Sequence, residues 1–538
     1  MNNLKNLPLA IAEFKELIET DSIYVDKTEE IFKLMEEAGN YFFLSRPRRF
    51  GKSLLLNTIK ELFRGNKELF KGLYIYNKWN WNENFPIIYL NMSKMSNRSP
   101  EKLELDLEDF IETIAEENQI TINNNISLER KFSHLIRKLS KSTGKKVVVL
   151  IDEYDKPILD KIDEMKIADA NREILKSFYE ILKGSEEYLH FVFLTGVSKF
   201  SQTSIFSGFN NATDLTLDPK FNNICGYTHH ELRTHFKDYI TLLAKKEFLS
   251  YNEVLNRIDY WYDGYSWDGI NKVYNPFSTL SLFRFLEFKN KWFESGTPTF
   301  LVKLLKIRND FKPILEPIKA FESSLSTFDL DNININTLLF QTGYLTIKSI
   351  EKAYEEICYT LDFPNFEVEN SFLNYLLNSY TNYQDDIKSL RYTLLKQIKN
   401  IDNGGFNSSL NSLLYNIPYQ IHKTNESYFH AIFIILFKLL GFNVRAEEST
   451  ISGRSDLVLE EDNFVVIAEF KYSTTKTSKN GDEIPIKSFK SMLNEAFNQI
   501  HDRGYYKKYT NTKIILIAIA FAGKDIESKM ELLNLDGG

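Results

Sequence analysis

The sequence predicts a multidomain α/β protein whose first domain is a parallel β-sheet with helices on both faces. Its 538 residues exceed what a single hydrophobic core usually supports. Four short apolar runs, rich in β-branched and aromatic residues, alternate with amphipathic helical stretches within residues 1–225. Continuous apolar runs of this kind are typical of strands that are buried on both faces of a parallel sheet.

The rest of the chain predicts two further regions. In residues 226–415 the strand signals fade and helical patterns such as "HHELRTHFKDYITLLAKKEF" dominate, so we expect a helical middle region. Residues 416–538 begin with the apolar helix "ESYFHAIFIILFKLLGF" and continue with short strands, a further helix and the strand "KIILIAIAF". This last region predicts a second, smaller α/β domain.

Composition limits the classes of protein to consider. The net charge of -7 is unlike that of a protein that coats nucleic acid, although local basic patches can still bind it. Two cysteines form no disulfide framework, and Cys225 with His229 and His230 lacks the further ligands that a zinc site needs. The longest apolar stretches fall far short of the roughly 20 residues that span a bilayer. We therefore expect a cytoplasmic protein without a membrane partner.

The stretch "SRPRRFGKSLLL" follows the first predicted strand and has the end of a phosphate-binding loop. Gly51, Lys52 and Ser53 open a helix, and such a loop points backbone N–H groups and a helix N-terminus at phosphate oxygens. The Lys then reaches the terminal phosphates and the hydroxyl holds magnesium. Arg46 stands where the first Gly of the usual pattern would be, so the stretch taken alone fits a basic turn equally well.

Two other predicted strands end in polar residues that complete a nucleotide site. "KKVVVLIDEYD" brings Asp152 and Glu153 to its end, and carboxylates on a buried strand are costly unless they are used. In ATPases with such a loop the first acid holds magnesium, and the second orients or activates the attacking water. "FVFLTGVSK" ends in Thr195, Ser198 and Lys199, where a polar group can sense the terminal phosphate. The alternative is that the two acids only cap the following helix.

With these motifs in place, the chain resembles the AAA-ATPase-like family over essentially its whole length. That family is similar to archaeal and bacterial ATPases of the STAND type, and its loop also has Arg at the position of Arg46. The motifs that carry the resemblance are "IYVDKTEEIFKLME", "FFLSRPRRFGKSLLLNTI", "VVVLIDEYDKPI", "FLTGVSKF", "WYDGY", "YNPFS" and "WFESGTPTFLVKLL".

The resemblance implies a P-loop NTPase sheet and gives roles to individual residues. Lys52 would contact the β- and γ-phosphates of ATP, Ser53 and Asp152 would hold Mg²⁺, and Glu153 would be the catalytic base. The stretch Tyr24–Thr28 would lie near the adenine.

Two interpretations remain for the basic residues of the loop. Arg46, Arg48 and Arg49 either assist with phosphate charge, with Arg48 or Arg49 also able to act on a neighbouring subunit, or point into solvent. The residues that we expect to bind ATP and its magnesium ion are Arg46, Arg49, Phe50, Gly51, Lys52, Ser53, Leu54, Asp152 and Ser198.

A second group of candidate residues lies near the C-terminus. In the strand "VVIAEFK", Glu469 and Lys471 are two residues apart and therefore project from one face, while Phe470 faces the opposite layer. Asp456, on the preceding strand of a hairpin, can converge on the same point. Two carboxylates form a magnesium site, and an adjacent Lys can stabilise charge on a phosphate or position a water. An ordinary salt-bridged strand is the alternative.

The order of elements around these residues resembles the PD-(D/E)XK nuclease fold, with Ser455 at the position of the Pro. The resemblance implies that Asp456 and Glu469 bind metal, Mg²⁺ or alternatively Mn²⁺, and that Lys471 is catalytic. Glu426 would be the acid on the first helix, and Gln499 would complete the site. An inactive version that only binds nucleic acid stays open.

Together these interpretations give a leading hypothesis and two alternatives. The leading one is an ATPase joined through a helical, winged-helix-containing middle region to a nuclease that cuts DNA or RNA, in defence or mobile-element biology. The second is a nucleotide-dependent switch whose C-terminal domain binds nucleic acid or protein without cleaving it. The third is a scaffolding protein. A homo-oligomer or a protein partner fits each of them.

Overall fold

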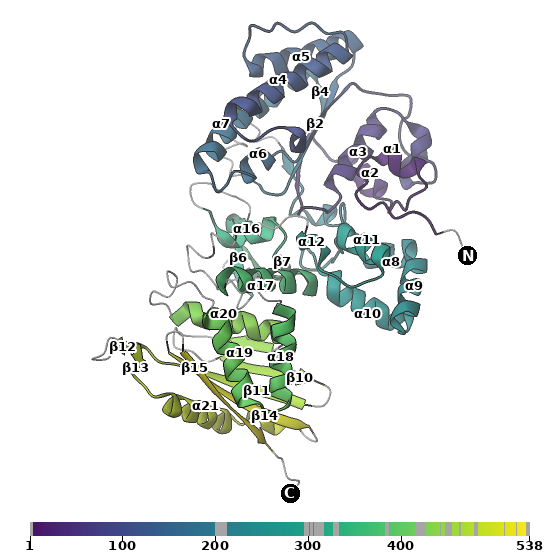
Figure 1. Ribbon diagram of the computed structural model, residues 1–538. Coiled ribbons are helices and arrows are strands. Elements are labelled where there is room, and N and C mark those ends of the chain that lie inside the picture. The colour runs from purple at the N-terminus through teal and green to yellow at the C-terminus, as the bar shows by residue number, and fades with distance from the viewer. Residues whose placement is uncertain are drawn as a thin grey trace. The chain divides into compact units, whose positions relative to one another are not determined.

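The computed structural model describes residues 4–199, 212–294, 301, 305, 317–325, 333–353, 355–381, 387–415, 426–441, 443–446, 455–461, 464–477, 483–509, 512–522 and 525–533. The chain divides into two compact units. The first comprises Met1–Leu301 and Ile318–Glu369, and the second comprises Val302–Pro317 and Asn370–Gly538. Figure 1 shows their elements by label.

The first unit is built around a parallel sheet of five strands in the order β2-β3-β4-β1-β5. The predicted parallel sheet is thus confirmed. Strands β1 and β3 are buried along their whole length, as their uninterrupted apolar sequences predict. Because β4 lies between β1 and β3, its end separates the loop after β1 from the acids after β3. The strands are β1 (Tyr41–Ser45), β2 (Ile87–Asn91), β3 (Val147–Asp152), β4 (Leu189–Gly196) and β5 (Thr213–Asp214).

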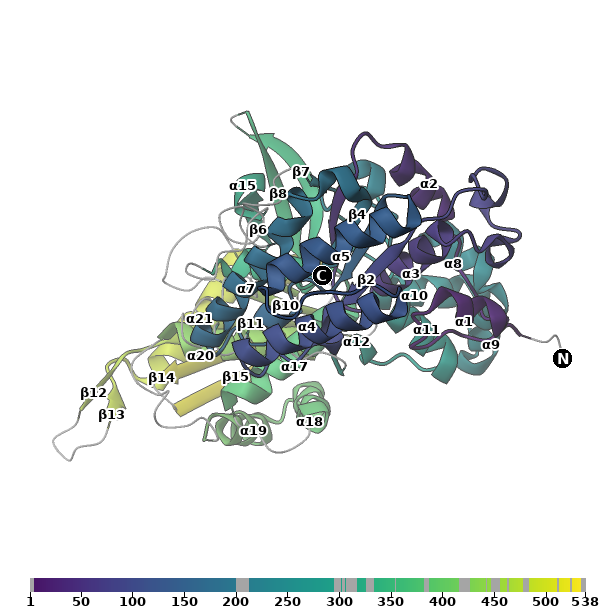
Figure 2. The ribbon, with the colours of Figure 1, turned by 90° about the horizontal axis from the view of Figure 1, so that it is seen from above.

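Two groups of helices cover this sheet. Helix α3 packs on β2, β3 and β4, whereas α4, α5 and α7 pack on one another and reach β3 through α5. In Figures 1 and 2 the groups α1–α3 and α4, α5 and α7 lie to opposite sides of β2 and β4. The helices are α1 (Phe14–Glu19), α2 (Thr28–Glu36), α3 (Lys52–Phe63), α4 (Pro100–Glu117), α5 (Leu128–Thr143), α6 (Lys156–Leu159) and α7 (Met165–Lys183).

Local sequence explains where these helices begin and which face they bury. Helix α4 begins with Pro100 after Ser99, whose side chain accepts a hydrogen bond from the Lys102 N–H and caps the helix. Helix α5 buries an apolar stripe at helical spacing, which includes Leu128, Phe132, Leu135 and Leu139.

A helical region follows the sheet in the first unit, as the sequence predicts. Helices α8 to α11 share an apolar core that includes Phe236, Ile258 and Phe283. Their bounds, with the short helix that follows, are α8 (His229–His235), α9 (Lys237–Glu247), α10 (Tyr251–Tyr262), α11 (Pro276–Phe285) and α12 (Lys291–Glu294).

The first unit ends in a small antiparallel sheet with the strand order β6-β8-β7. Among the described residues, helices α15 and α16 lie between its first two strands along the chain, and this order is consistent with the winged helix that we expect in the middle region. The elements are β6 (Ile318–Phe321), α15 (Glu322–Leu325), α16 (Ile335–Gln341), β7 (Thr346–Ala353), β8 (Glu356–Asp362) and α17 (Phe366–Thr381), the last of which continues into the second unit.

The second unit contains a mixed sheet in the order β15-β14-β11-β10-β9, in which only β11 and β14 pair in parallel. The predicted smaller α/β domain is thus confirmed. Its strands are β9 (Asn443–Ala446), β10 (Ser455–Glu461), β11 (Phe464–Tyr472), β14 (Lys513–Ala522) and β15 (Asp525–Leu533), with a separate hairpin of β12 (Thr475–Thr477) and β13 (Glu483–Pro485). Its helices are α18 (Ile387–Lys399), α19 (Asn403–Tyr415), α20 (Glu426–Leu440) and α21 (Phe489–Arg503).

Helices cover this sheet from different sides and in part come from the region that we assigned to the middle of the chain. Helix α21 packs on β11 and β14. Helix α19 packs on β15, where Asn407 and Asn411 bond the backbone of Ser528 and Ile526. The predicted boundaries at 225/226 and 415/416 stay predictions.

None of the helices in the described ranges is long and apolar enough to cross a membrane.

Candidate functional site

The loop after β1 leads into a cleft of about 440 Å³ in the first unit. Gly51 is the N-cap of α3 and has a φ of 90°, a left-handed conformation that favours glycine. No side chain caps this helix, so its first-turn N–H groups are not taken up by a capping residue. The lining includes Arg48, Arg49, Phe50, Gly51, Lys52, Ser53 and Leu54 from the loop and helix start, and Glu153, Asp155 and Lys156 from the turn after β3.

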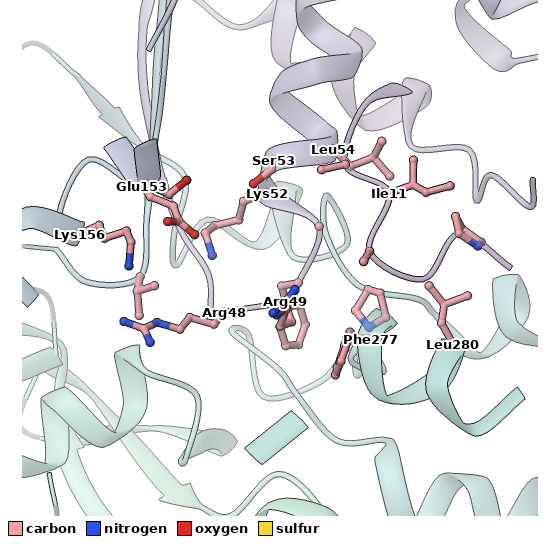
Figure 3. Close-up of a pocket in the computed structure, with 18 of the residues that line it drawn as sticks. Ile11, Arg48, Arg49, Lys52, Ser53, Leu54, Glu153, Lys156, Phe277 and Leu280 are labelled. Atoms are coloured by element: carbon pink, nitrogen blue, oxygen red, sulfur yellow. The ribbon is translucent and has the colours of Figure 1, made fainter. Parts of the chain in front are cut away.

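Lys52 occupies the centre of this cleft. Its Nζ donates hydrogen bonds to the carbonyl oxygens of Arg46 and Pro47, at 2.9 Å each, and its side chain is buried. Burial lowers the pKa of the Lys52 amine, while the charges of Glu153 and Asp152 oppose that shift. Figure 3 shows Lys52 and Glu153 pointing toward one another. A buried cation at the start of α3 therefore lies opposite Glu153, the acid that follows β3.

Asp152, the last residue of β3, is buried and only partly hydrogen-bonded. Asp152 is 0% exposed, and its Oδ1 accepts a hydrogen bond of 2.9 Å from the Thr195 hydroxyl. Its Oδ2 is buried, and no described residue donates to it. An unpaired buried carboxylate oxygen is costly in a folded protein, so the donor set fits a bound cation.

Glu153 follows in a strained position. Its φ of 54° is a left-handed conformation, which costs a non-glycine residue roughly 1–3 kcal/mol and is common at functional sites. Burial raises the pKa of the Glu153 carboxyl, and the Lys52 charge opposes this. A carboxyl of this kind suits a proton acceptor.

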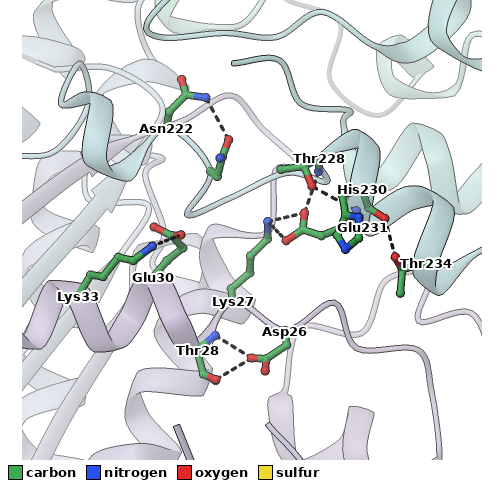
Figure 4. Close-up of polar contacts among 11 residues, drawn as sticks. Asp26, Lys27, Thr28, Glu30, Lys33, Asn222, Thr228, His230, Glu231 and Thr234 are labelled. Atoms are coloured by element: carbon green, nitrogen blue, oxygen red, sulfur yellow. Dashed lines mark hydrogen bonds and ion pairs between the residues drawn. The ribbon is translucent and has the colours of Figure 1, made fainter. Parts of the chain in front are cut away.

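A second, smaller cavity adjoins the loop. It shares Pro8, Phe50, Gly51, Leu54, Tyr227 and Pro276 with the larger cleft and is further lined by Tyr24, Val25, Lys27 and Cys225. The expected adenine segment is thus part of a cavity wall next to the phosphate loop. An ion pair fixes this segment, because Lys27 Nζ lies 2.7 Å and 2.8 Å from the two carboxylate oxygens of Glu231 (Figure 4).

The second unit brings three of the predicted nuclease residues together. Lys471 Nζ lies 3.2 Å from Glu469 Oε1 and also donates to Gln499 Oε1 of α21. Glu469 is 2% exposed. Phe470 points the other way and packs on Phe437 of α20, so the predicted alternation along this strand holds. The three polar side chains lie beside an open cleft lined by Lys471, Gln499 and further residues of α21.

Two further predicted residues are placed by their backbone alone. Glu426 begins α20, and Asp456 lies in β10, but both side chains fall outside the described part of the chain. In the antiparallel ladder Leu457 pairs with Ala468. Continuing that register by one residue places Asp456 opposite Glu469. The backbone therefore permits the convergence that the sequence predicts, and the roles of Asp456 and Glu426 stay predictions.

Comparison with known proteins agrees with both halves of this description. Residues 8–206 match the family described as "Predicted AAA-ATPase", and residues 424–531 match the PD-(D/E)XK nuclease superfamily. A protein of Azotobacter chroococcum mcd 1, described as "Uncharacterized protein in vnfD 5'region", is 36% identical over 511 residues, which cover 94% of each chain. The chain belongs to the AAA-ATPase-like family and carries a C-terminal PD-(D/E)XK nuclease superfamily domain.

In this AAA-ATPase-like protein, the structure places Arg46 away from the cleft. Its side chain is 0% exposed and does not line the cleft. The guanidinium donates to the carbonyl oxygens of Ser45, Thr216 and Phe221 and lies 3.9 Å from the ring centroid of Trp267. We expected Arg46 either to contact phosphate or to point into solvent, and its buried side chain outside the cleft does neither.

The other predicted loop residues divide into two groups. The exposed Arg48 and Arg49 line the cleft, where Arg48 Nη2 lies 3.4 Å from Asp160 Oδ1 and Arg49 lies over the Phe277 ring. Phe50 is buried and packs edge-on against Tyr265. Of the predicted cofactor residues, Gly51, Lys52, Ser53, Leu54, Arg49 and Phe50 line the cleft, whereas Arg46, Asp152 and Ser198 do not.

Sequence reasoning in this AAA-ATPase-like protein missed residues that line the site. Asp155, two residues after Glu153, lines the cleft, while Ser198 is buried and bonded to it. Cys225 and Tyr227 line the smaller cavity, although the sequence analysis considered Cys225 only as a rejected zinc ligand and gave Tyr227 no role. Asp155 could have been found as the third acid of the motif "IDEYD", whereas no local sequence pattern marks Cys225 or Tyr227.

Proposed function

We propose that this protein binds ATP with Mg²⁺ in the cleft of the first unit and hydrolyses it. The observation that supports this most is the position of Lys52. It is the one buried amine described in the cleft, it lies at the start of α3, and it faces the acids of the β3 turn. A helix N-terminus, a Lys and acids on a neighbouring strand are the parts that phosphoryl transfer uses.

In this proposal each residue has a separate task. The N–H groups at the start of α3 and Lys52 bind the phosphates, and Ser53 and Asp152 hold the metal. Magnesium supplies charge neutralisation on the phosphates when bound. Glu153 accepts the proton of the attacking water, and its raised pKa brings it closer to neutral pH, where a base is most effective. The cavity beside Tyr24 and Val25 takes the adenine.

We further propose that the second unit cleaves phosphodiester bonds of DNA or RNA, in defence or mobile-element biology. The support is the contact of Lys471 with both Glu469 and Gln499 beside an open cleft. In the proposed site Asp456 and Glu469 bind Mg²⁺ or Mn²⁺, and Glu426 adds a carboxylate from α20. Lys471 stabilises negative charge on the phosphate, and Gln499 holds the Lys471 amine in place.

The experiment that tests both proposals uses the full chain and two matched pairs of variants. Phosphate release from ATP is measured with Mg²⁺ for the wild type, Lys52→Ala and the exposed control Lys15→Ala. Cleavage of a mixed DNA and RNA panel is measured with Mg²⁺ or Mn²⁺, with and without ATP, for the wild type and Lys471→Ala. Lys513→Ala is its control, since Lys513 pairs with Phe464 at the other end of β11.

We expect Lys52→Ala to abolish ATP turnover and Lys471→Ala to abolish cleavage while ATP binding persists. Cleavage by the Lys471→Ala variant at the wild-type rate would refute the nuclease proposal. ATP turnover without any cleavage would support instead a nucleotide-dependent switch whose second unit only binds its partner. If the wild type shows neither turnover nor metal binding, a scaffolding role replaces both.

A further inference from the structure

The turn after β3 contains a third carboxylate, Asp155, that the proposed mechanism does not use. Asp155 is 1% exposed, and its Oδ2 accepts three hydrogen bonds. The donors are the Val197 N–H at 3.0 Å, the Ser198 N–H at 2.6 Å and the Ser198 hydroxyl at 2.7 Å. One buried carboxylate oxygen thus binds the segment that directly follows β4.

The end of β4 also holds Asp152, the acid that we propose as a metal ligand. The Thr195 hydroxyl donates to Asp152 Oδ1 at 2.9 Å, and the Tyr154 N–H donates to the Thr195 carbonyl at 3.0 Å. The Tyr154 hydroxyl donates to the Ser198 carbonyl at 3.0 Å. Hydrogen bonds therefore join Asp152 and Tyr154, at the end of β3 and in the turn after it, to Thr195 and Ser198.

The phosphate loop is attached to the same segment from the other side. The Arg46 N–H donates to the Gly196 carbonyl at 3.1 Å, and the Ser45 hydroxyl donates to the Val197 carbonyl. Since β4 lies between β1 and β3, residues 195–198 are the connection between the loop and the acids. They hydrogen-bond both to the start of the loop that leads to Lys52 and to Asp152.

The Asp155 carboxylate packs directly against the backbone of β4. A Cβ on Gly196 would lie 2.8 Å from Asp155 Oδ1 and 2.5 Å from the Tyr154 ring, so the acid is seated directly against the backbone of β4. Asp155 Oδ1 is buried, and no described residue donates to it. Burial raises the pKa of the Asp155 carboxyl, and the hydrogen bonds from Ser198 oppose this. The structure keeps this acid against β4 despite that cost.

We propose that Asp155 is a positioning residue for nucleotide hydrolysis, which holds residues 195–198 so that Thr195 keeps Asp152 in place opposite Lys52. This inference rests on the proposed ATPase function. Loss of the Asp155 charge weakens the hold on Val197 and Ser198 and lets the acids shift relative to the loop. A displacement of about 1 Å in such a site is enough to slow a reaction by roughly 100-fold. Asp155 lines the cleft, but its printed side-chain hydrogen bonds go to Val197 and Ser198 and not to the loop or α3, so we expect nucleotide binding to change less than hydrolysis.

The test compares Asp155→Asn with the wild type in the full chain, with Asp169→Asn, an exposed acid of α7, as the matched control. Three quantities are measured: the Kd of a fluorescent ATP analogue, the single-turnover rate of ATP hydrolysis, and the magnesium concentration that gives half-maximal analogue binding. We expect Asp155→Asn to lower the hydrolysis rate at least tenfold and to change the Kd by less than about threefold. We expect an unchanged magnesium requirement.

Two outcomes overturn the proposal. A hydrolysis rate for Asp155→Asn equal to that of Asp169→Asn would show that the carboxylate only supports the fold. A magnesium requirement raised as much as in Asp152→Asn would make Asp155 a metal ligand and not a positioning residue. If Asp155→Asn does not fold, Ser198→Ala carries the same test, because it removes one donor to Asp155, and we expect a threefold to tenfold slower rate at unchanged Kd.

The same experiment separates this inference from the function on which it rests. A wild type that binds the analogue but does not hydrolyse ATP refutes the proposed ATPase activity, and the role of Asp155 falls with it. A wild type that hydrolyses ATP while Asp155→Asn is equally fast refutes only the role of Asp155.

Discussion

The guanidinium of Arg46 lies 3.9 Å from the ring centroid of Trp267 and donates to three backbone carbonyl oxygens. The first of the three basic residues in the loop therefore links the end of β1 to residues 216–221 and to the segment that follows α10. Arg46, the residue that departs from the usual phosphate-loop pattern, therefore packs the end of β1 against other parts of the first unit.

Replacing Arg46 should destabilise the first unit. Arg46→Ala removes three hydrogen bonds from a buried guanidinium to backbone carbonyl oxygens, together with the contact on Trp267, so we expect a loss of at least about 3 kcal/mol in unfolding free energy. Arg46→Lys keeps the charge but not the planar group, and we expect most of the same loss. Thermal unfolding of the nucleotide-free protein measures this. The control is Arg48→Ala, whose exposed pair with Asp160 should contribute less than about 1 kcal/mol. Equal unfolding temperatures for the two alanine variants would contradict this role of Arg46.

The turn that follows α16 contacts the phosphate loop at Gly343. This residue has a φ of 89°, and a Cβ at this position would lie 2.6 Å from the Cβ and Cγ atoms of Pro47. We expect Gly343→Ala to lower the unfolding temperature and to weaken ATP binding, because the loop must move to relieve the overlap. Gly72→Ala is a matched control, since Gly72 has a φ of 85° and no neighbouring atom within 4 Å of its would-be Cβ. If both variants bind ATP equally well, this contact has no effect on the loop.

Gln499 should matter for cleavage through Lys471. Its Oε1 accepts a hydrogen bond from Lys471 Nζ, and partners of this kind usually change activity by about 10- to 100-fold when removed. We therefore expect Gln499→Ala to slow single-turnover cleavage of nucleic acid at least tenfold. The neighbouring Asn498 lines the same cleft, and Asn498→Ala should change the rate by less than about threefold. Similar rates for the two variants would remove Gln499 from the site.

His229 should make stability depend on pH. A hydrogen bond to Asp263 raises the pKa of His229 above its usual 6.5, and Asp259 acts in the same direction while Arg233 opposes it. The Tyr274 hydroxyl lies 2.9 Å from the other ring nitrogen. Because the folded-state pKa is raised, the stabilisation is fully present below about pH 6.5 and is lost as the pH rises through the folded-state value.

The unfolding temperature of His229→Gln should therefore fall below that of the wild type at pH 5.5, and the gap should narrow by pH 8.5. His230→Gln, at the exposed neighbouring residue, is the control. A gap that is the same at both pH values would show that the charge on His229 does not contribute.

The parts of the site that the sequence predicted are those with a local signature. The burial of β1 and β3, the helix start at Lys52 and the contact between Glu469 and Lys471 follow from periodicity and spacing within a few residues. The role of Arg46 does not, because its partners Thr216 and Phe221 lie 170 and 175 residues away and form no pattern with it.

The same physical reason explains two other differences between sequence and structure. Helix α19 lies in the part of the chain that we assigned to the helical middle region, yet it packs on β15 through Asn407 and Asn411, and this packing depends on tertiary contacts. In the sequence, Asp155 is one of three acids close to a predicted strand end. Only the pairing of β4 with β3 brings Ser198 within hydrogen-bond distance of it.

Above all, we propose that the cleft around Lys52 hydrolyses ATP. The most direct measurement is magnesium-dependent phosphate release by the purified full chain, compared among the wild type, Lys52→Ala and Lys471→Ala. We expect turnover by the wild type and by Lys471→Ala, and a loss of at least about 100-fold in Lys52→Ala, because a main electrostatic contact to the phosphates is removed. Turnover by Lys52→Ala at the wild-type rate, or no turnover by any of the three proteins, would contradict ATP hydrolysis in this cleft.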